Sequence, residues 1–98
     1  VEISQLAVIM PEKFILYQNY PNPFNPTTNI KFDIEKSGFT SLSVFDMTGK
    51  EIAKLVNQNL STGTYEYEFN AIDLPSGIYF YKLETPNSSS VKKMSLIK

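Results

Sequence analysis

The chain contains no cysteine, no histidine, no tryptophan and no arginine. Without cysteine it can form neither a disulfide framework nor a thiolate metal site. Without histidine it lacks the usual general base near neutral pH and the commonest transition-metal ligand. Without arginine it lacks the planar donor that nucleic-acid and phosphate sites favour. These absences argue against an enzyme, a zinc protein and a nucleic-acid-binding protein.

The length and composition are those of one folded domain. The 98 residues are 42% hydrophobic and 13% aromatic, which is too apolar for a disordered tail. No apolar run approaches the roughly 18 residues of a membrane-spanning helix. The chain begins with Val1, so we expect a fragment of a longer protein. Residues 1–10, VEISQLAVIM, are expected to be a linker or lead-in from an upstream domain, and residues 11–98 the domain itself.

The charge is small overall but unevenly placed. Residues 1–84 hold six lysines and ten acidic residues, a balance of −4, whereas residues 85–98 hold three lysines and no acid, a balance of +3. The net charge of −1 gives no general attraction for a polyanion such as nucleic acid. The C-terminal tail, by contrast, is locally basic.

Short alternating segments separated by turn residues predict strands throughout the chain. They are NIKFDI (29–34), SLSVFD (41–46), KEIAKLV (50–56), TYEYEF (64–69), IYFYKLE (78–84) and VKKMSLIK (91–98). Six or seven such strands at roughly regular spacing, with no crossover helix, predict an all-β, antiparallel sandwich. IYFYKLE is apolar on both faces, which predicts a central strand that is covered on two sides.

Two turns carry recognisable chemistry. DMTG predicts a type I turn with Asp46 first and Gly49 last. Gly77, directly before the central strand, is expected at a bend or bulge where a side chain would collide.

The stretch YPNPFNPTT predicts a stiff, extended segment that leads into the strand at 29–34, because proline fixes φ and extends the residue before it. Its two asparagines can cap their own turns. Tyr20 and Phe24 are expected to plug one end of the core. Pro23 and Pro26 also match the PxxP ligand pattern, but a structural clamp is the better interpretation because no arginine lies nearby.

The acidic residues suggest no catalytic or metal site. Glu66 and Glu68 could be a glycosidase pair, but two residues apart on a strand they share one solvated face, and Asp33 and Glu35 have the same interpretation. The acids at turns lack EF-hand spacing. We therefore assign no catalytic, cofactor-binding or metal-ligating residue.

The tyrosines at strand spacing leave an alternative function open. Tyr65, Tyr67, Tyr79 and Tyr81 could form a sugar-stacking strip, although packing in the core is the usual role of such residues. The alternative is therefore a carbohydrate-binding or adhesive sandwich appended to a secreted enzyme.

The tail KKMSLIK has two interpretations. It could be an edge strand that lysines protect from aggregation. It could also be an address, a basic terminal strand exposed for another protein to recognise.

From Pro11 to Lys98 the chain resembles the type A C-terminal sorting domain of cargo proteins of the type IX secretion system, which is found in Bacteroidetes and related bacteria. The resemblance rests on FILYQNYPNPFNPTTNIKF, SLSVFDMTGKEIAKLV, TGTYEYEF, LPSGIYFYKLE and KKMSLIK, in this order. It implies an immunoglobulin-like β-sandwich at the C-terminus of a larger cargo protein, without catalytic activity. The protein would be exported through the periplasm to the cell surface or the extracellular medium.

The resemblance also implies partners and residue roles. The partners would be the outer-membrane translocon, a surface sortase with its attachment proteins, and the upstream cargo domain of the same chain. The family's closing motif, the sorting signal, falls on Lys92, Lys93, Met94 and Lys98. Its structural motifs fall on Pro21, Asn22, Pro23, Asn25, Pro26, Asp46, Gly49, Gly77 and Tyr79.

Overall fold

The computed structural model describes residues 3–7 and 11–98, and within these ranges the chain forms eight strands and no helix. The strands are β1 (Ile3–Ala7), β2 (Ile15–Leu16), β3 (Thr27–Ile34), β4 (Gly38–Phe45), β5 (Glu51–Leu60), β6 (Gly63–Asn70), β7 (Gly77–Glu84) and β8 (Ser89–Leu96). The predicted all-β class is confirmed. The count exceeds the expected seven because β1 and β2 are short outer strands.

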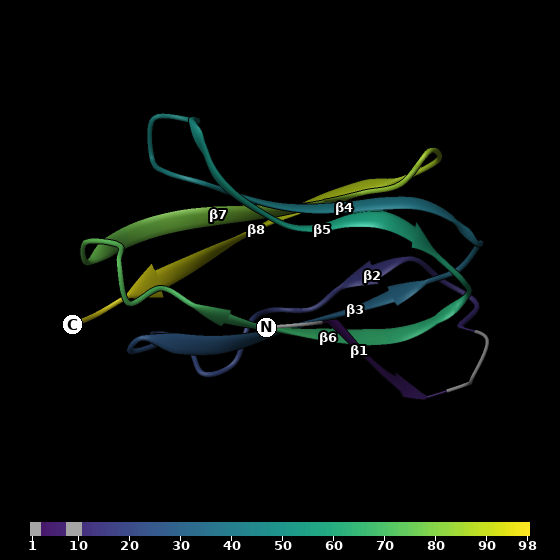
Figure 1. Cartoon of the computed structure of the whole chain (residues 1–98), viewed down its shortest axis with the longest axis horizontal. Coiled ribbons are helices and arrows are strands. Elements are labelled where there is room, and N and C mark those ends of the chain that lie inside the picture. Colours follow the sequence, from purple (N-terminus) through teal and green to yellow (C-terminus); the bar gives the residue numbers. More distant parts are fainter. Residues whose placement is uncertain (1–2, 8–10) are drawn as a thin grey trace.

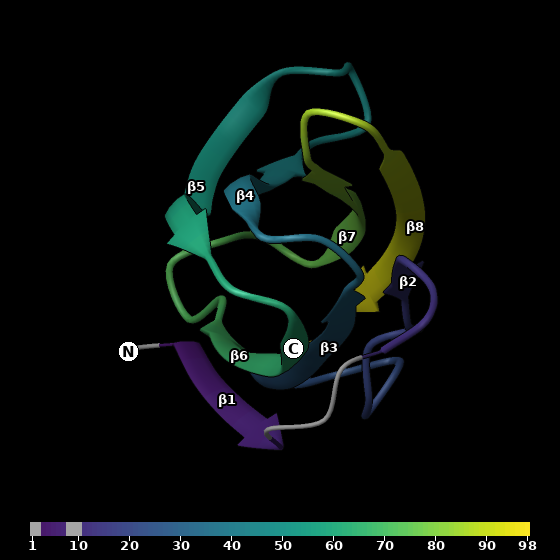
Figure 2. The same ribbon diagram turned by 90° about the vertical axis from the view of Figure 1, so that its right-hand side faces the viewer.

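The strands form two four-stranded sheets that face each other as the layers of a sandwich (Figure 1). One sheet has the order β1-β6-β3-β2, the other the order β5-β4-β7-β8, and all neighbouring pairs are antiparallel. Viewed from the end, the two sheets curve around one interior (Figure 2). This is the layered arrangement of an immunoglobulin-like sandwich, as the resemblance implied.

Alternation along the strands builds the core between the sheets. Ile30, Phe32 and Ile34 of β3 are all at most 1% exposed, as their two-residue spacing predicts. They lie next to β6, where the ring of Tyr65 stacks on Phe32 with 5.7 Å between the centroids. Side chains from both sheets thus meet in a single hydrophobic core.

The start of β7 carries a feature typical of immunoglobulin-like domains. The Tyr79 hydroxyl donates a hydrogen bond to the Pro75 carbonyl, four residues upstream, at 2.6 Å. Such a tyrosine corner fixes the path of the chain where it crosses from one sheet to the other. Gly77 precedes it with φ of +156°, a conformation that L side chains rarely adopt. A Cβ at Gly77 would meet no atom within 4 Å, so the predicted collision is wrong and the backbone conformation explains the glycine.

The two faces of β7 differ, contrary to the prediction that both are covered. Its inward residues are buried, whereas Ile78, Phe80 and Lys82 on the other face are only half-buried. The reason is the number of layers, since a two-layer sandwich leaves the outer face of each sheet to solvent. Apolar residues on both faces therefore did not mean burial on both faces.

Within the predicted lead-in, residues 3–7 form β1, which pairs with β6. Residues 1–2 and 8–10 lie outside the described residues, so the proposed boundary between residues 10 and 11 stays a prediction. In the described ranges, nothing qualifies as a helix that could cross a membrane.

Candidate functional site

The predicted sorting signal lies in β8, the edge strand of the β5-β4-β7-β8 sheet. Met94 and Leu96 alternate with Lys93 and Ser95, and this alternation places the two apolar side chains in the core, 0% and 2% exposed. β8 pairs with β7 along its whole length, from Ser89 to Leu96. The tail is therefore an integral strand of the sandwich and not a free extension.

The segment 18–24, called the clamp here, covers the C-terminal half of the outer edge of β8. Phe24 donates its N–H to the Ser95 carbonyl at 2.9 Å and accepts the Ile97 N–H at 2.9 Å. The Asn22 side chain accepts the Ser95 N–H at 2.9 Å. The Gln18 side-chain amide donates to the Lys93 carbonyl at 2.7 Å. The proline-rich motif thus contacts the chain terminus more than 70 residues away.

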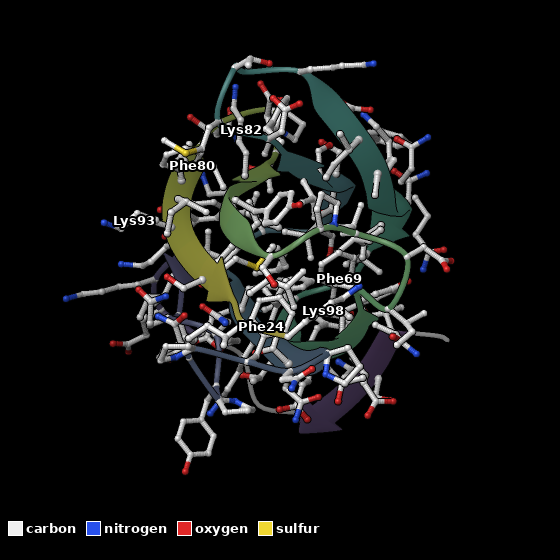
Figure 3. All side chains as sticks on the ribbon, turned by 90° about the vertical axis from the view of Figure 1, so that its left-hand side faces the viewer. Phe24, Phe69, Phe80, Lys82, Lys93 and Lys98 are labelled. Carbon is white, nitrogen blue, oxygen red and sulfur yellow. The ribbon has the colours of Figure 1, made fainter. Side chains whose placement is uncertain are left out.

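A buried aromatic ring anchors the clamp. The Phe24 side chain is 2% exposed and lies in the interior near Phe69, with 6.3 Å between the ring centroids (Figure 3). Tyr20 is 80% exposed, so the prediction that it also plugs the core is wrong. The segment follows a series of bends and is not extended as predicted; the peptide bonds before Pro21, Pro23 and Pro26 are cis.

A buried polar network ties the clamp to β7. The Tyr81 hydroxyl donates to the Tyr17 carbonyl at 2.8 Å and accepts the Asn19 N–H at 2.7 Å. The Asn19 side-chain amide in turn donates to the Thr28 hydroxyl and to the Pro21 carbonyl. Burial raises the pKa of Tyr81 to about 12, against a weaker opposing effect of its hydrogen bond with the Asn19 backbone. The hydroxyl is therefore neutral at physiological pH and available as a donor.

The N-terminal half of the β8 edge differs from the half that the clamp covers. In an antiparallel pair, backbone groups point alternately toward and away from the partner strand. Ser95 points away from β7, toward the clamp, so Lys93 and Val91 point outward as well. Among the described residues, nothing hydrogen-bonds to the Lys93 N–H or to the N–H and carbonyl of Val91. This stretch is an unpaired sheet edge.

The four predicted sorting residues lie in different surroundings. Lys92 and Lys93 project to opposite faces, because Lys92 is opposite buried Tyr81 and Lys93 is opposite Phe80 on the outer face. Lys92 is half-buried and Lys93 is exposed. Met94 is completely buried and cannot contact a receptor while the domain is folded. The structure therefore does not bring these residues together as one surface.

Lys98 is held against the loop between β6 and β7. Its N–H donates to the Ser76 hydroxyl at 3.0 Å, and its ammonium group donates to the Ile72 carbonyl. Lys98 is exposed, but both its backbone N–H and its side-chain ammonium group are hydrogen-bonded to this loop. Its position is on the opposite end of β8 from the unpaired edge.

The turn between β4 and β5 forms as predicted. Gly49 donates its N–H to the Asp46 carbonyl at 3.0 Å and has φ of +89°, which glycine adopts without strain. The Asp46 carboxylate accepts the Thr48 hydroxyl and the N–H groups of Thr48 and Lys50. The Thr48 hydroxyl, followed by the backbone bond from Lys50, lowers the pKa of Asp46. Asp46 and Gly49 thus have a structural role.

The prediction that the tyrosines could form an exposed strip for binding a sugar is wrong. Tyr65, Tyr79 and Tyr81 are at most 6% exposed, and their hydroxyls are bound to protein oxygens. Tyr67 is half-buried against the core. No exposed row of aromatic faces remains for a sugar among the tyrosines of the described strands.

Of the four acidic residues that were expected on solvated faces, Asp33 is buried. Glu68 and Glu35 are exposed, as a solvated face predicts, and Glu66 is half-buried. Asp33 is 8% exposed and accepts hydrogen bonds from the hydroxyls of Tyr17 and Thr64, both at 2.7 Å. The hydrogen bond from the Tyr17 hydroxyl to the Asp33 carboxylate is the main cause of the raised pKa of Tyr17. Among the described residues, no cluster of acidic side chains could hold a metal ion.

Sequence analysis missed a groove on the outer face of the β5-β4-β7-β8 sheet. Its volume is about 320 Å³, and its lining is mainly apolar. The lining residues are Phe45, Asp46, Met47, Gly49, Phe80, Lys82 and Val91. The groove could have been recognised from the apolar residues that alternate with the core residues in β4, β7 and β8. The prediction that the strand at 78–84 is covered on both faces placed its apolar residues in the interior instead.

Comparison with known proteins gives one family match. The family model described as secretion system C-terminal sorting domain matches residues 18–98, which is most of the chain. No curated protein matches the sequence.

Solved structures share the fold. One similar structure is PorZ, described as an essential bacterial surface component of the type-IX secretion system of human oral-microbiomic Porphyromonas gingivalis. The TM-score is 0.59 and the sequence identity 23%, over 85% of this chain. The matched region spans 11% of the length of the PorZ chain. At this identity the likeness shows a common fold.

Proposed function

Because the chain belongs to the family of secretion system C-terminal sorting domains, we propose that the unpaired N-terminal half of β8 is the part of its surface that the export machinery recognises. The domain directs the protein that carries it through the type IX outer-membrane secretion machinery, to the cell surface or the extracellular medium. The proposal concerns how this sorting domain is recognised.

The observation that supports the proposal is the unpaired edge formed by both backbone groups of Val91 and the N–H of Lys93. Exposed edges are the usual acceptors of an added strand from a partner, and folded proteins normally cover or charge them. The rest of the β8 edge is covered by the clamp. A stretch that is charged but not covered, beside a covered one, fits a surface that is open to a partner of opposite charge.

The lysines of β8 add an electrostatic contribution to the encounter. Lys92 and Lys93 lie on a strand that has no acidic residue, and neither forms an ion pair with a described residue. Their attraction to an acidic receptor surface would speed association and weaken as the salt concentration rises. Lys98 would contribute less, because its ammonium group already contacts the Ile72 carbonyl.

The buried positions set limits on this proposal. Met94 and Leu96 fill the core, so their effect on export would follow from the fold and not from direct contact with a receptor. The same holds for the clamp motif, for Asp46 and Gly49, and for the tyrosine corner at Tyr79. All of these residues are proposed to be structural members of the family motif.

We further propose that residues 11–98 are the sorting domain and that residues 1–10 lead in from the upstream cargo. The domain itself would be non-catalytic, in line with the general character of the family. Its partners would be the outer-membrane translocon and the surface sortase with its attachment proteins. Part of this lead-in, β1, would add a strand to the edge of the domain's sheet beside β6.

The test is export of a folded reporter that carries the whole chain at its C-terminus, in a host with a type IX system. The variant Lys92→Gln/Lys93→Gln should reduce export, whereas the control Lys50→Gln/Lys54→Gln removes the same charge from exposed residues at β5, the opposite edge of the same sheet. Equal export of the two variants, with unchanged folding by circular dichroism, would refute a role for the β8 lysines. A reporter that stays in the periplasm even with the unaltered chain would refute the sorting function.

A further inference from the structure

We propose that the unpaired edge of β8 accepts one antiparallel strand whose outward side chains are acidic opposite Lys93 and apolar opposite Val91. This inference rests on the proposed function, because it names the chemistry of the partner at the same edge. It predicts a ligand pattern of acid, any residue, apolar residue, counted from the N-terminus of the added strand.

The backbone of β8 sets the length and the position of this strand. The available groups are the Lys93 N–H and both backbone groups of Val91, while the Lys93 carbonyl is already bound to Gln18. The clamp blocks the edge beyond Lys93, at Ser95 and Ile97. β2, which belongs to the other sheet, lies beside β8 and limits the room at this edge (Figure 2). A short strand that presents its specific side chains on the outer face fits these limits.

The register of the sheet places the outer-face residues in rows across the strands. Phe45, Phe80 and Lys93 are paired in one row, and Ser43, Lys82 and Val91 in the next. Figure 3 shows Phe80 and Lys82 on the outer face and Lys93 projecting from β8. An added strand would extend each row by one residue, so its side chains would lie next to Lys93 and Val91.

Each row favours a different side chain. Lys93 is exposed and has no ion-pair partner among the described residues, and Lys82 in the neighbouring row approaches only Glu84, at 3.9 Å. A carboxylate opposite Lys93 would therefore meet an uncompensated positive charge. Val91 is 54% exposed and borders the groove of about 320 Å³ that Phe45, Met47 and Phe80 also line. An apolar side chain opposite Val91 would remove this surface from water.

A second copy of the chain fits the edge less well. If two β8 strands paired antiparallel about Lys92, a lysine would lie directly opposite a lysine, and if they paired about Val91, each Lys93 would lie opposite Ser89 and gain no carboxylate. Like charges in such pairs are destabilising. Neither register gives Lys93 an ion pair, so a partner that carries acids fits the edge better.

The experiment titrates the whole 98-residue chain with short peptides and follows backbone amide shifts by NMR. The probe is the blocked heptapeptide Thr-Thr-Glu-Thr-Val-Thr-Thr; one control has lysine in place of glutamate, and another exchanges the glutamate and valine positions. We expect shifts centred on Val91 and Lys93, and binding about tenfold tighter than for either control, from one ion pair and one apolar contact. Equal affinities, or no shifts at millimolar peptide, would overturn the inference.

Two variants separate an added strand from general charge attraction. In Val91→Pro the outward N–H is lost and peptide binding should disappear, although the β7–β8 ladder keeps its hydrogen bonds. In Lys93→Glu the preference should reverse in favour of the lysine peptide. Binding that survives Val91→Pro, or a preference unchanged in Lys93→Glu, would contradict the inference. Sedimentation of the chain without peptide tests whether a second copy occupies the edge instead. A dimer that becomes monomeric in Val91→Pro would show that it does and would contradict the inference.

Failure of the inference can be told apart from failure of the proposed function. If Val91→Pro abolishes reporter export but the acidic peptide binds no better than its controls, the edge is the recognised surface and only the ligand chemistry is wrong. If the acidic peptide binds as expected but Val91→Pro is exported normally, the edge binds such strands without serving export, and the proposed function fails.

Discussion

The two halves of β8 have the same alternating pattern but opposite roles at their outer edge. From Ser95 onward, the clamp takes up the outward backbone groups of the strand. At Val91 and Lys93 the outward N–H groups have no partner among the residues described. The comparison teaches that a terminal strand can be fixed in the core by one half while the other half stays available to a partner.

The covered half should depend most strongly on the aromatic anchor of the clamp. Phe24→Ala removes a ring that is 2% exposed and should lower the free energy of unfolding by about 3–5 kcal/mol. Urea denaturation followed by circular dichroism measures this loss. Tyr20→Ala is the matched control four residues away, since its ring is 80% exposed, and it should cost less than about 0.5 kcal/mol. Similar losses for the two variants would show that the clamp does not anchor through Phe24.

Proline at adjacent positions of β8 should separate the ladder from the open edge. Lys92→Pro removes an N–H that faces β7, breaks a hydrogen bond of the ladder and should cost about 1–3 kcal/mol. Val91→Pro removes an N–H that faces outward and should cost less than about 1 kcal/mol, because proline is tolerated on edges. Thermal unfolding of the two variants compares them directly. Equal destabilisation would mean that the outward direction of Val91 is incorrect.

The buried hydroxyl beneath the clamp should make stability sensitive to alkaline pH. The pKa of Tyr81 is about 12 in the folded chain, above the ordinary value of 10, so its contribution is complete below pH 10 and is lost as the pH rises through 12. Tyr81→Phe leaves the Asn19 N–H unpaired and should cost about 1–3 kcal/mol at neutral pH. It should also flatten the fall in stability between pH 10 and 12, as measured by urea denaturation. An unchanged alkaline profile would contradict this assignment, with Tyr17→Phe as the comparison because the pKa of Tyr17 is raised too.

The smallest effect is expected from the side-chain contact of the clamp with the edge. Asn22→Ala removes the acceptor of the Ser95 N–H and should cost about 1 kcal/mol. Hydrogen exchange should then speed up at Ser95 but not at Met94, whose N–H faces β7. Uniform acceleration along β8 would show that the clamp stabilises the whole strand and not its C-terminal half.

The sequence predicted the strands better than it predicted the contacts between distant segments. The alternation of Ile30, Phe32 and Ile34 and the turn from Asp46 to Gly49 were sufficient because both are local. The same alternation in MSL identifies Met94 as a core residue, although it directly follows the two lysines of the basic tail. Nothing local distinguishes Tyr20 from Phe24, because their burial is decided by where the clamp meets β8.

The candidate site could be predicted only in part for a similar reason. The basic character of the tail is visible in the composition, so Lys92 and Lys93 could be named as candidates from the sequence. The unpaired edge depends on the strand order and on where the clamp ends, which are properties of the assembled sandwich. Val91 therefore carried no signal until the fold placed it at the open edge beside the groove.

Export of the reporter fused to the Val91→Pro chain tests the central claim most directly. The account predicts that export falls to the level of the reporter without the domain, while the thermal unfolding of the chain stays close to that of the unaltered protein. Normal export of a variant that folds normally would show that the machinery does not use the open edge of β8.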